Sequence, residues 1–150
     1  MQVPFDTLDA HLRDAGDIAR ASKPMGWMLA WAVQMQLLAP SVQQAHEQLV
    51  LRIRYREARG SELLVACGGD LNRELFTPAG EAFLDDYYPH YWADLEQAFG
   101  PDIYAVEDTW DSYGAISPLI TRAYMSRHSQ SRSIAGQFAR GLRKIFRKGP

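Results

Sequence analysis

The side chains best suited to chemistry are clustered carboxylates. One cluster holds Glu107, Asp108 and Asp111. Paired carboxylates beside an aromatic ring, here Trp110, can act as general acid and base in glycoside hydrolysis. Carboxylates this close in sequence at the start of a helix more simply complement the helix dipole and cap its free N–H groups. We therefore interpret this cluster as the acidic start of a helix, without a catalytic role.

A second acidic cluster has some features of a metal site. Asp86 and His90 are four residues apart, a spacing that places two ligands on one face of a helix. Glu81 and Asp85 would lie nearby. Pro89 distorts this spacing, and the sequence has no second histidine in an HExxH-like pair. We favour a solvated acidic face and expect neither a metal nor another cofactor.

The single cysteine, Cys67, precedes two glycines and could be a nucleophile on a turn. A nucleophilic cysteine needs a general base, and the four histidines are scattered outside any known signature. We interpret Cys67 as a structural thiol, and a lone cysteine fits a reducing cytoplasm. The two glycines also lack the GxGxxG or GxxxxGK spacing of a phosphate-binding loop.

The net charge of −2 hides opposite charges in different parts of the chain. Residues 1–56 carry a net charge of +1, residues 57–116 carry −11, and residues 117–150 carry +8. Such polarity between segments is more informative about interactions than the total charge.

The composition indicates one soluble globular domain of 150 residues, with 47% hydrophobic and 23% charged residues. The most apolar window, residues 25–39, is shorter than the roughly twenty apolar residues that a membrane span needs. We predict a central buried helix over residues 25–38 that starts after Ser22-Lys23-Pro24 and is ended by Pro40. The first residues lack a basic segment followed by an apolar run, so no secretory signal is predicted.

Capping signals predict further helices in an all-α single domain of five or six helices. A first helix is expected within residues 4–14, capped by Asp6 or Thr7. The sequence SVQQ at 41–44 matches a capping box and opens a second helix. Residues 49–56 fit both strand alternation and one helical face, and the nearby capping box favours a helix.

Proline marks the later helices. Thr77 followed by Pro78 predicts the start of a long helix that Pro89 interrupts. A last core helix is expected from about Asp111, and Pro118 either kinks it or marks its true start.

The helical domain is expected to span residues 1–128, and residues 129–150 are predicted to form a basic amphipathic tail helix. The apolar residues of the tail fall on one stripe: Ile134, Phe138, Leu142, Ile145 and Phe146. The tail could pack on its own acidic domain, lie on anionic lipid or contact nucleic acid. The acidic domain would repel a polyanion, which argues against nucleic acid and leaves a membrane open as a partner of the tail.

Four segments occur in an order that resembles a family of small uncharacterised bacterial proteins. They are GWMLAWAV (26–33), ELLVACGGDL (62–71), TPAGEAFLDDYY (77–88) and YAVEDTWDSYGAISPLITR (104–122). The family has a GMFLAWA-like helix, an EGNAF…YY helix and a DTWxxY…PxI close, and the resemblance covers roughly residues 22–127. The chain departs from the pattern at Gly69 and at Ala79-Gly80. The resemblance implies a shared fold unit and no mechanism.

The sequence leads us to expect a non-enzymatic, cytoplasmic protein-binding module, most concretely an immunity-type inhibitor of a bacterial toxin. An acidic, aromatic-rich face could occlude a basic toxin cleft, with electrostatic steering raising the association rate. The expected partner-binding residues are Asp85, Asp86, Asp94, Glu107, Asp108, Trp110 and Asp111. Two alternatives stay open: a small metal-dependent hydrolase using the clustered carboxylates, and a peripheral membrane adaptor using the tail.

Overall fold

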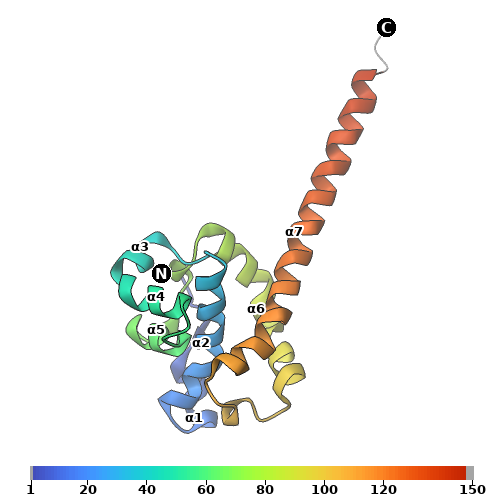
Figure 1. Cartoon of the computed structure of the whole chain (residues 1–150). Helices are drawn as coiled ribbons and strands as arrows, with labels where there is room; N and C mark the ends of the chain where they lie inside the picture. The colour runs from blue at the N-terminus through green and yellow to red at the C-terminus, as the bar shows by residue number, and fades with distance from the viewer. Residues whose placement is uncertain (1, 148–150) are drawn as a thin grey trace.

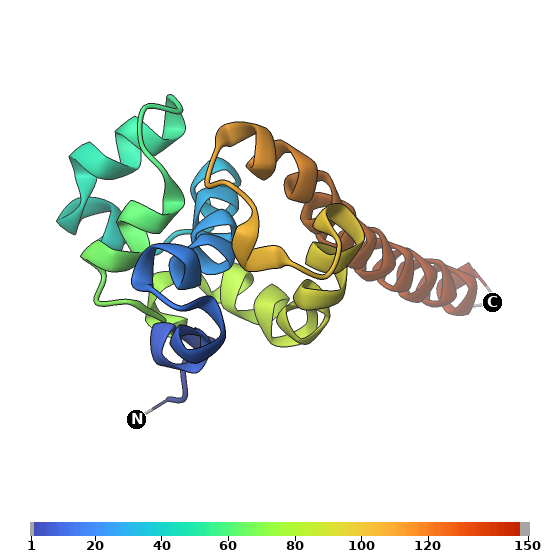
Figure 2. The same cartoon turned by 90° about the horizontal axis from the view of Figure 1, so that it is seen from below.

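A buried helix, α2 (Ile18–Gln34), forms the centre of the fold. All residues from 21 to 33 are buried, and a helix that is apolar on every face needs neighbours on all sides. Figure 2 shows α3 (Pro40–Ala45), α4 (Glu47–Arg54) and α5 (Gly60–Ala66) on one side of α2. On the other side lie α6 (Pro78–Phe99) and the start of α7 (Trp110–Arg147). The predicted all-α domain with a central helix is confirmed.

The structure describes the backbone of residues 2–147 and the side chains of residues 2–129. Seven α-helices lie in this part of the chain, slightly more than the five or six expected. None of these helices has a stretch that is both long and apolar enough to cross a membrane.

The bounds of α2 correct the sequence-based expectation. The helix begins at Ile18, because the carboxylate of Asp17 caps it by accepting from the backbone N–H of Arg20 at 2.8 Å. Pro24 therefore lies inside the helix, where tertiary packing outweighs the hydrogen bond that proline cannot make. The helix also ends before Pro40, and Gln36 leaves it with a φ of 59°.

Two shorter helices replace the single helix expected after residue 40. Helix α3 begins at Pro40, and its N-cap residue is Ala39, whose side chain makes no capping hydrogen bond. The capping box predicted at residues 41–44 is therefore wrong. Proline suits this position because its missing N–H has no partner there anyway. The chain breaks at His46. Helix α4 then confirms the helical interpretation for residues 49–54, whereas Tyr55 and Arg56, also predicted to be helical, lie in the turn after it, where Arg56 has a φ of 61°.

Both long helices run through their prolines. The Thr77 hydroxyl accepts from the N–H of Gly80 at 3.1 Å, which confirms the predicted start of α6, and this helix passes Pro89 without a break. In the same way α7 contains Pro118 and continues past residue 128 to Arg147. Figure 1 shows the C-terminal part of α7 projecting from the rest of the fold. The predicted apolar stripe of the tail lies outside the side chains that the structure describes.

Short elements attach the N-terminal segment to the rest of the domain. Strand β1 (Asp6–Thr7) pairs antiparallel with β2 (Asp70–Leu71), and α1 (Leu8–Ala15) follows with Thr7 as its predicted N-cap. The 3₁₀ turns η1 (Arg73–Leu75) and η2 (Ile103–Ala105) precede α6 and α7.

The backbones of α2 and α5 touch at two glycines. A Cβ atom added to Gly60 would lie 1.8 Å from the carbonyl oxygen of Gly26. Only glycine allows this approach, which fixes the start of α5 against α2 and places Arg59 and Ser61 beside the central helix.

Candidate functional site

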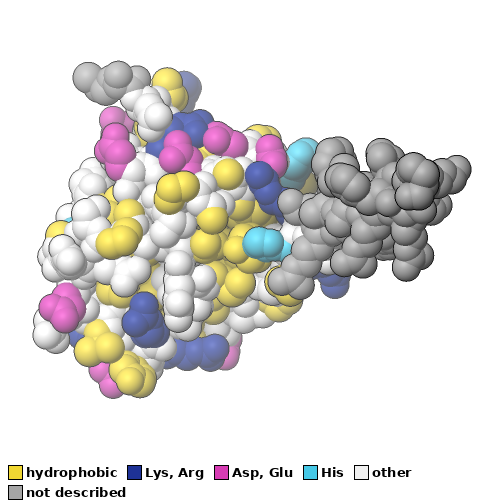
Figure 3. All heavy atoms as spheres, turned by 90° about the horizontal axis from the view of Figure 1, so that it is seen from above, with side chains coloured by type: hydrophobic (Ala, Val, Ile, Leu, Met, Phe, Trp, Pro, Cys, Tyr) yellow, Lys and Arg dark blue, Asp and Glu magenta, His cyan; other side chains and the backbone are white. Residues whose placement is uncertain are grey.

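The acidic residues predicted to bind a partner fall into two groups, and the first lies on α6. Asp85 accepts a hydrogen bond from the Arg73 guanidinium at 2.6 Å, and Asp86 forms an ion pair with Arg127 of α7. Figure 3 shows acidic side chains in a row on one face of the molecule, with basic side chains close by. This part of the surface is therefore of mixed charge.

Asp94, two turns further along α6, has a more internal role. Its carboxylate is half-buried and accepts from the hydroxyl of Tyr87 at 2.6 Å. Burial first, and then Asp94 itself, raises the pKa of Tyr87, which keeps the phenol protonated as a donor. The structure thus separates Asp94 from the exposed acids of α6.

The second acidic group lies where the loop after η2 enters α7. Glu107 and Asp111 are exposed, whereas Asp108 is half-buried and accepts from the Ser61 hydroxyl of α5 at 2.5 Å. The Thr109 hydroxyl accepts from the N–H of Ser112 at 3.1 Å and so caps the first turn of α7. Trp110, the first residue of α7, is half-buried. This group therefore faces the start of α5.

A buried lysine of α2, Lys23, stabilises the loop that carries the second acidic group. Lys23 of α2 is 7% exposed, and its ammonium donates to the carbonyl oxygens of Tyr104, at 2.6 Å, and Val106. Burial lowers the pKa of Lys23, and the negative charge of Asp108 opposes this shift. Lys23, which was expected at the start of a helix, therefore lies inside α2 and stabilises the acidic loop.

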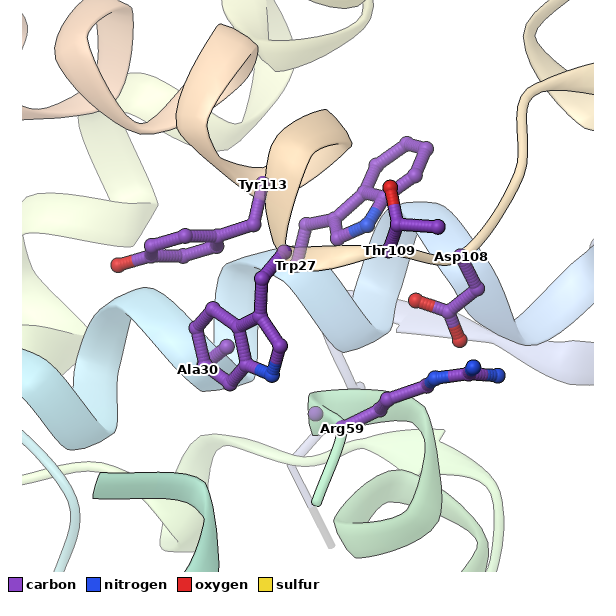
Figure 4. Close-up of a pocket in the computed structure, with 8 residues that line it drawn as sticks. Trp27, Ala30, Arg59, Asp108, Thr109 and Tyr113 are labelled. Carbon is purple, nitrogen blue, oxygen red and sulfur yellow. The ribbon is translucent and has the colours of Figure 1, made fainter. Parts of the chain in front are cut away.

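A narrow pocket opens between α2, the start of α5 and the start of α7 (Figure 4). The space in it that a water-sized sphere can enter is about 10 Å³, which is enough for about one water molecule. The lining residues are Trp27, Ala30, Arg59, Gly60, Asp108, Thr109, Trp110 and Tyr113. The pocket is thus too small for a ligand, but it brings together residues that are distant in the sequence.

The rim of the pocket carries arginines that sequence reasoning missed. The Arg56 guanidinium lies over the Trp110 ring, 5.3 Å from its centroid, and Arg59 lines the pocket itself. Trp110 meets Tyr113 edge-on, with ring centroids 4.9 Å apart. Burial raises the pKa of Tyr113 to about 12, while Arg56 acts in the opposite direction. Trp110 therefore lies against the positive charge of Arg56, and Asp108 interacts with that of Lys23.

A metal-dependent reaction and a nucleophilic cysteine have less support from the arrangement of side chains. Asp86 and His90 line one shallow hollow between α6 and α7, but Arg127 pairs with that carboxylate. Within residues 2–129, no group of three or more His, Cys, Asp or Glu side chains is placed to hold a metal ion. Burial raises the pKa of Cys67, which disfavours the thiolate that a nucleophile would need.

A second polar cluster, also missed from the sequence, ties the N-terminus to the body. The Asp6 carboxylate accepts from the Tyr88 hydroxyl and bonds His11 Nε2 at 2.7 Å. His11 Nδ1 lies 2.6 Å from the Tyr104 hydroxyl, and the imidazole stacks on Trp92 with centroids 5.1 Å apart. These polar groups are partnered with one another, so we interpret the cluster as structural.

A family model described as a domain of unknown function matches residues 5–106, from β1 to the end of η2. The match includes Trp27 and Arg59 and stops just before the acidic loop. No curated protein and no solved structure matches the chain.

Proposed function

We propose that this chain, which belongs to the DUF7832 family of domains of unknown function, is a non-enzymatic protein-binding module. The observation that carries the proposal is the surface around Trp110. Trp110 is half-buried and lies between the exposed residues Glu107 and Asp111 in the sequence, and the Arg56 guanidinium lies over its ring. We call these four residues the Trp110 surface.

The composition of the Trp110 surface supports binding to a protein. Tryptophan and arginine are enriched among the residues that contribute most to protein interfaces, and charged residues at the rim steer association. A partner that covered the indole would remove its remaining exposed area from water, while the two carboxylates would attract a basic surface.

More concretely, we propose an immunity-type inhibitor that acts in the cytoplasm by covering the basic cleft of a bacterial toxin. The excess of acidic residues between 57 and 116 supports this choice, as does the exposure of Glu107 and Asp111 beside an aromatic anchor. Asp85 and Asp86 could extend the contact, although each already pairs with an arginine.

The test begins with capture of a partner by the tagged chain from lysate of its own host, at low and at high salt. The affinity of that partner is then measured for the double variant Glu107→Lys/Asp111→Lys. The matched control, Glu74→Lys/Glu96→Lys, changes the net charge equally at exposed positions on η1 and α6. We expect the first variant to weaken binding at least tenfold at low salt and the control to change it little.

Two results would contradict the proposal. One is an unchanged affinity after charge reversal at the Trp110 surface. The other is failure to capture any stoichiometric partner at either salt concentration, since the proposed steering makes low salt favourable for binding.

A further inference from the structure

One face of α7 packs against the domain over the first turns of the helix. Ile116 and Ile120 are buried in the core, and the half-buried Tyr124 ring meets Phe83 of α6 edge-on, with centroids 5.2 Å apart. These three α7 positions are spaced by four residues, so they lie one above the other on the helix. They define the face of α7 that is turned toward the domain.

The same face continues in the tail, the part of α7 beyond residue 129. Three apolar residues of the tail follow those three positions by eighteen residues each, which is about five turns of an α-helix: Ile134, Phe138 and Leu142. Counted at about 100° per residue, the apolar positions of the tail fall within an arc of about 140°. They are Ile134, Ala135, Phe138, Ala139, Leu142, Ile145 and Phe146. The basic residues of this part of α7 fall outside this apolar arc: Arg132, Arg140, Arg143, Lys144 and Arg147.

A helix with such an arc needs a cover for it, because apolar side chains are driven out of water. Figure 1 shows that the tail projects beyond the other elements of the fold. The part of α7 before residue 129 has its cover in the domain, and the tail continues the same face past the end of that cover.

A hollow between α6 and α7 lies at the base of the tail. Its lining residues are Ala79, Ala82, Phe83, Tyr124, Arg127 and His128. Ala79 and Ala82 are exposed, and small side chains let a second helix approach α6 closely. Asp86 follows Ala82 by one turn, and its side chain is 73% exposed although it pairs with Arg127. Figure 3 shows hydrophobic side chains and a row of acidic ones on the face from which α7 projects.

We propose that the tail pairs antiparallel with the tail of a second copy of this chain, and that each tail ends on the hollow of the other copy. The two apolar arcs then cover one another. Arg143, Lys144 and Arg147, in the last turns of one tail, come to lie beside the acidic side chains of α6 in the other copy. Such a contact is the same on both sides and closes as a twofold dimer.

Charge selects the antiparallel direction. The tail has six basic residues up to Lys148 and no acidic residue, and most of these charges lie in its second half. A parallel pair would bring the two sets of positive charges together, whereas an antiparallel pair separates them and brings each set to an acidic domain. Residues 57–116 carry a net charge of −11, which favours that placement.

The lengths of the elements set the alignment of the two tails. Helix α7 ends at Arg147, and His128 is the last residue of α7 that lines the hollow. If Arg147 of one copy reaches the level of His128 of the other, the pair is centred near Phe138. Phe138 then meets its counterpart, and Ile134 lies opposite Leu142 of the other copy. The domains lie at opposite ends of this pair, so they do not collide.

Other occupants account for fewer of these observations. A flat anionic membrane that covered the apolar arc would run into the domain, because the domain lies on the same side of α7. Packing of the tail on its own domain would break a helix that is continuous from Trp110 to Arg147. A nucleic acid would neutralise the basic residues but would leave the apolar arc in water. The Trp110 surface lies at the other end of α7, so the dimer leaves it free.

Sedimentation velocity of the full chain over a range of concentrations tests the pairing. We expect a monomer–dimer equilibrium with a Kd in about the micromolar range. Phe138→Glu places a charge at the centre of the pair and should raise this Kd at least about tenfold. The matched control, Gln137→Glu, introduces the same charge one residue earlier, outside the apolar arc, and should change the Kd by less than about threefold. Circular dichroism checks that both variants keep the helix content of the unaltered chain.

Disulfide formation tests the direction of the pair. The single cysteine, Cys67, is replaced by serine, and Ile134→Cys and Leu142→Cys are introduced into separate chains. Only the antiparallel pair places position 134 opposite position 142. A mixture of the two chains should therefore form the mixed disulfide dimer at least about fivefold faster than either chain forms its own.

Four outcomes overturn the inference. They are a chain that stays monomeric about a hundredfold above the expected Kd, equal weakening by Phe138→Glu and Gln137→Glu, and faster disulfide formation in either chain alone than in the mixture. The fourth is flotation of a monomeric chain with phosphatidylglycerol vesicles that Phe138→Glu abolishes, which would assign the apolar arc to lipid. None of these assays contains the proposed toxin, so their failure is distinct from a failure of the proposed function.

Discussion

Replacing Gly60 with alanine tests the contact on which the geometry of the pocket depends. The added Cβ would lie 1.8 Å from the carbonyl oxygen of Gly26, 2.7 Å from its carbonyl carbon and 2.9 Å from the backbone nitrogen of Ala30. All three atoms belong to the backbone of α2, so no side chain can rotate away. The start of α5 must therefore move outward from the central helix.

The expected cost follows from this geometry. Overpacking a well-packed core typically destabilises a protein by about 1–3 kcal/mol. Because the added Cβ would clash only with backbone atoms, which cannot move aside as a side chain can, we expect Gly60→Ala to lie at the upper end of this range, at about 3 kcal/mol. Alanine restricts the unfolded chain more than glycine does, which offsets about 0.4–1 kcal/mol. The net loss of about 2 kcal/mol should lower the melting temperature by about 4–8 °C for a chain of this length.

Thermal and urea unfolding, followed by circular dichroism, measure this loss. Gly114→Ala is the matched control, because Gly114 lies in α7 and an added Cβ there meets no atom within 4 Å. This control should gain about 0.5–1 kcal/mol from the better helix propensity of alanine. If Gly60→Ala melted at or above the temperature of the unaltered chain, the close contact between α2 and α5 would be refuted.

Three further predictions concern ionisable groups. Lys23→Met leaves two carbonyl oxygens without their donor and should cost about 2–4 kcal/mol in urea unfolding, with faster amide exchange in residues 103–108. Asp86→Asn removes an exposed ion pair and should change the free energy of unfolding by less than about 0.5 kcal/mol, so a larger loss would contradict the exposure described here. Between pH 10.5 and 12 stability should fall, because the folded chain keeps phenolic protons that the unfolded chain releases near pH 10. Tyr113, with its pKa of about 12, should contribute a loss of about 2 kcal/mol by pH 12, and stability that rises over this interval in urea titrations would contradict the sign.

The parts of the fold that the sequence predicts are those set by local signals. Thr77 and Pro78 mark the start of α6 because a capping hydroxyl and a residue without an N–H act within one turn. The start of α2 was misplaced because Pro24 suggested a first helical turn, whereas burial of the whole helix lets the proline sit inside it. The two-residue strands are too short to leave any periodicity in the sequence.

The pocket could not be predicted, because tertiary packing alone brings its polar groups together. Trp27, Arg59 and Asp108 come from three elements far apart in the sequence, and no motif links them. The acids near Trp110 were identifiable from their density, but the arginine over that ring was not, since cation–π contacts have no sequence spacing across a fold.

The burial of Lys23 gives the chain a built-in chemical reporter. It is the only lysine within residues 2–129; the other two are Lys144 and Lys148. Acylating reagents attack the neutral amine, which its lowered pKa favours, yet the carbonyl oxygens of residues 104 and 106 cover this nitrogen while the loop is closed. The rate at which Lys23 is acylated, read by peptide mass spectrometry, therefore measures how often the loop beside the pocket opens. A bound partner that held the loop shut would slow that labelling without touching the lysine.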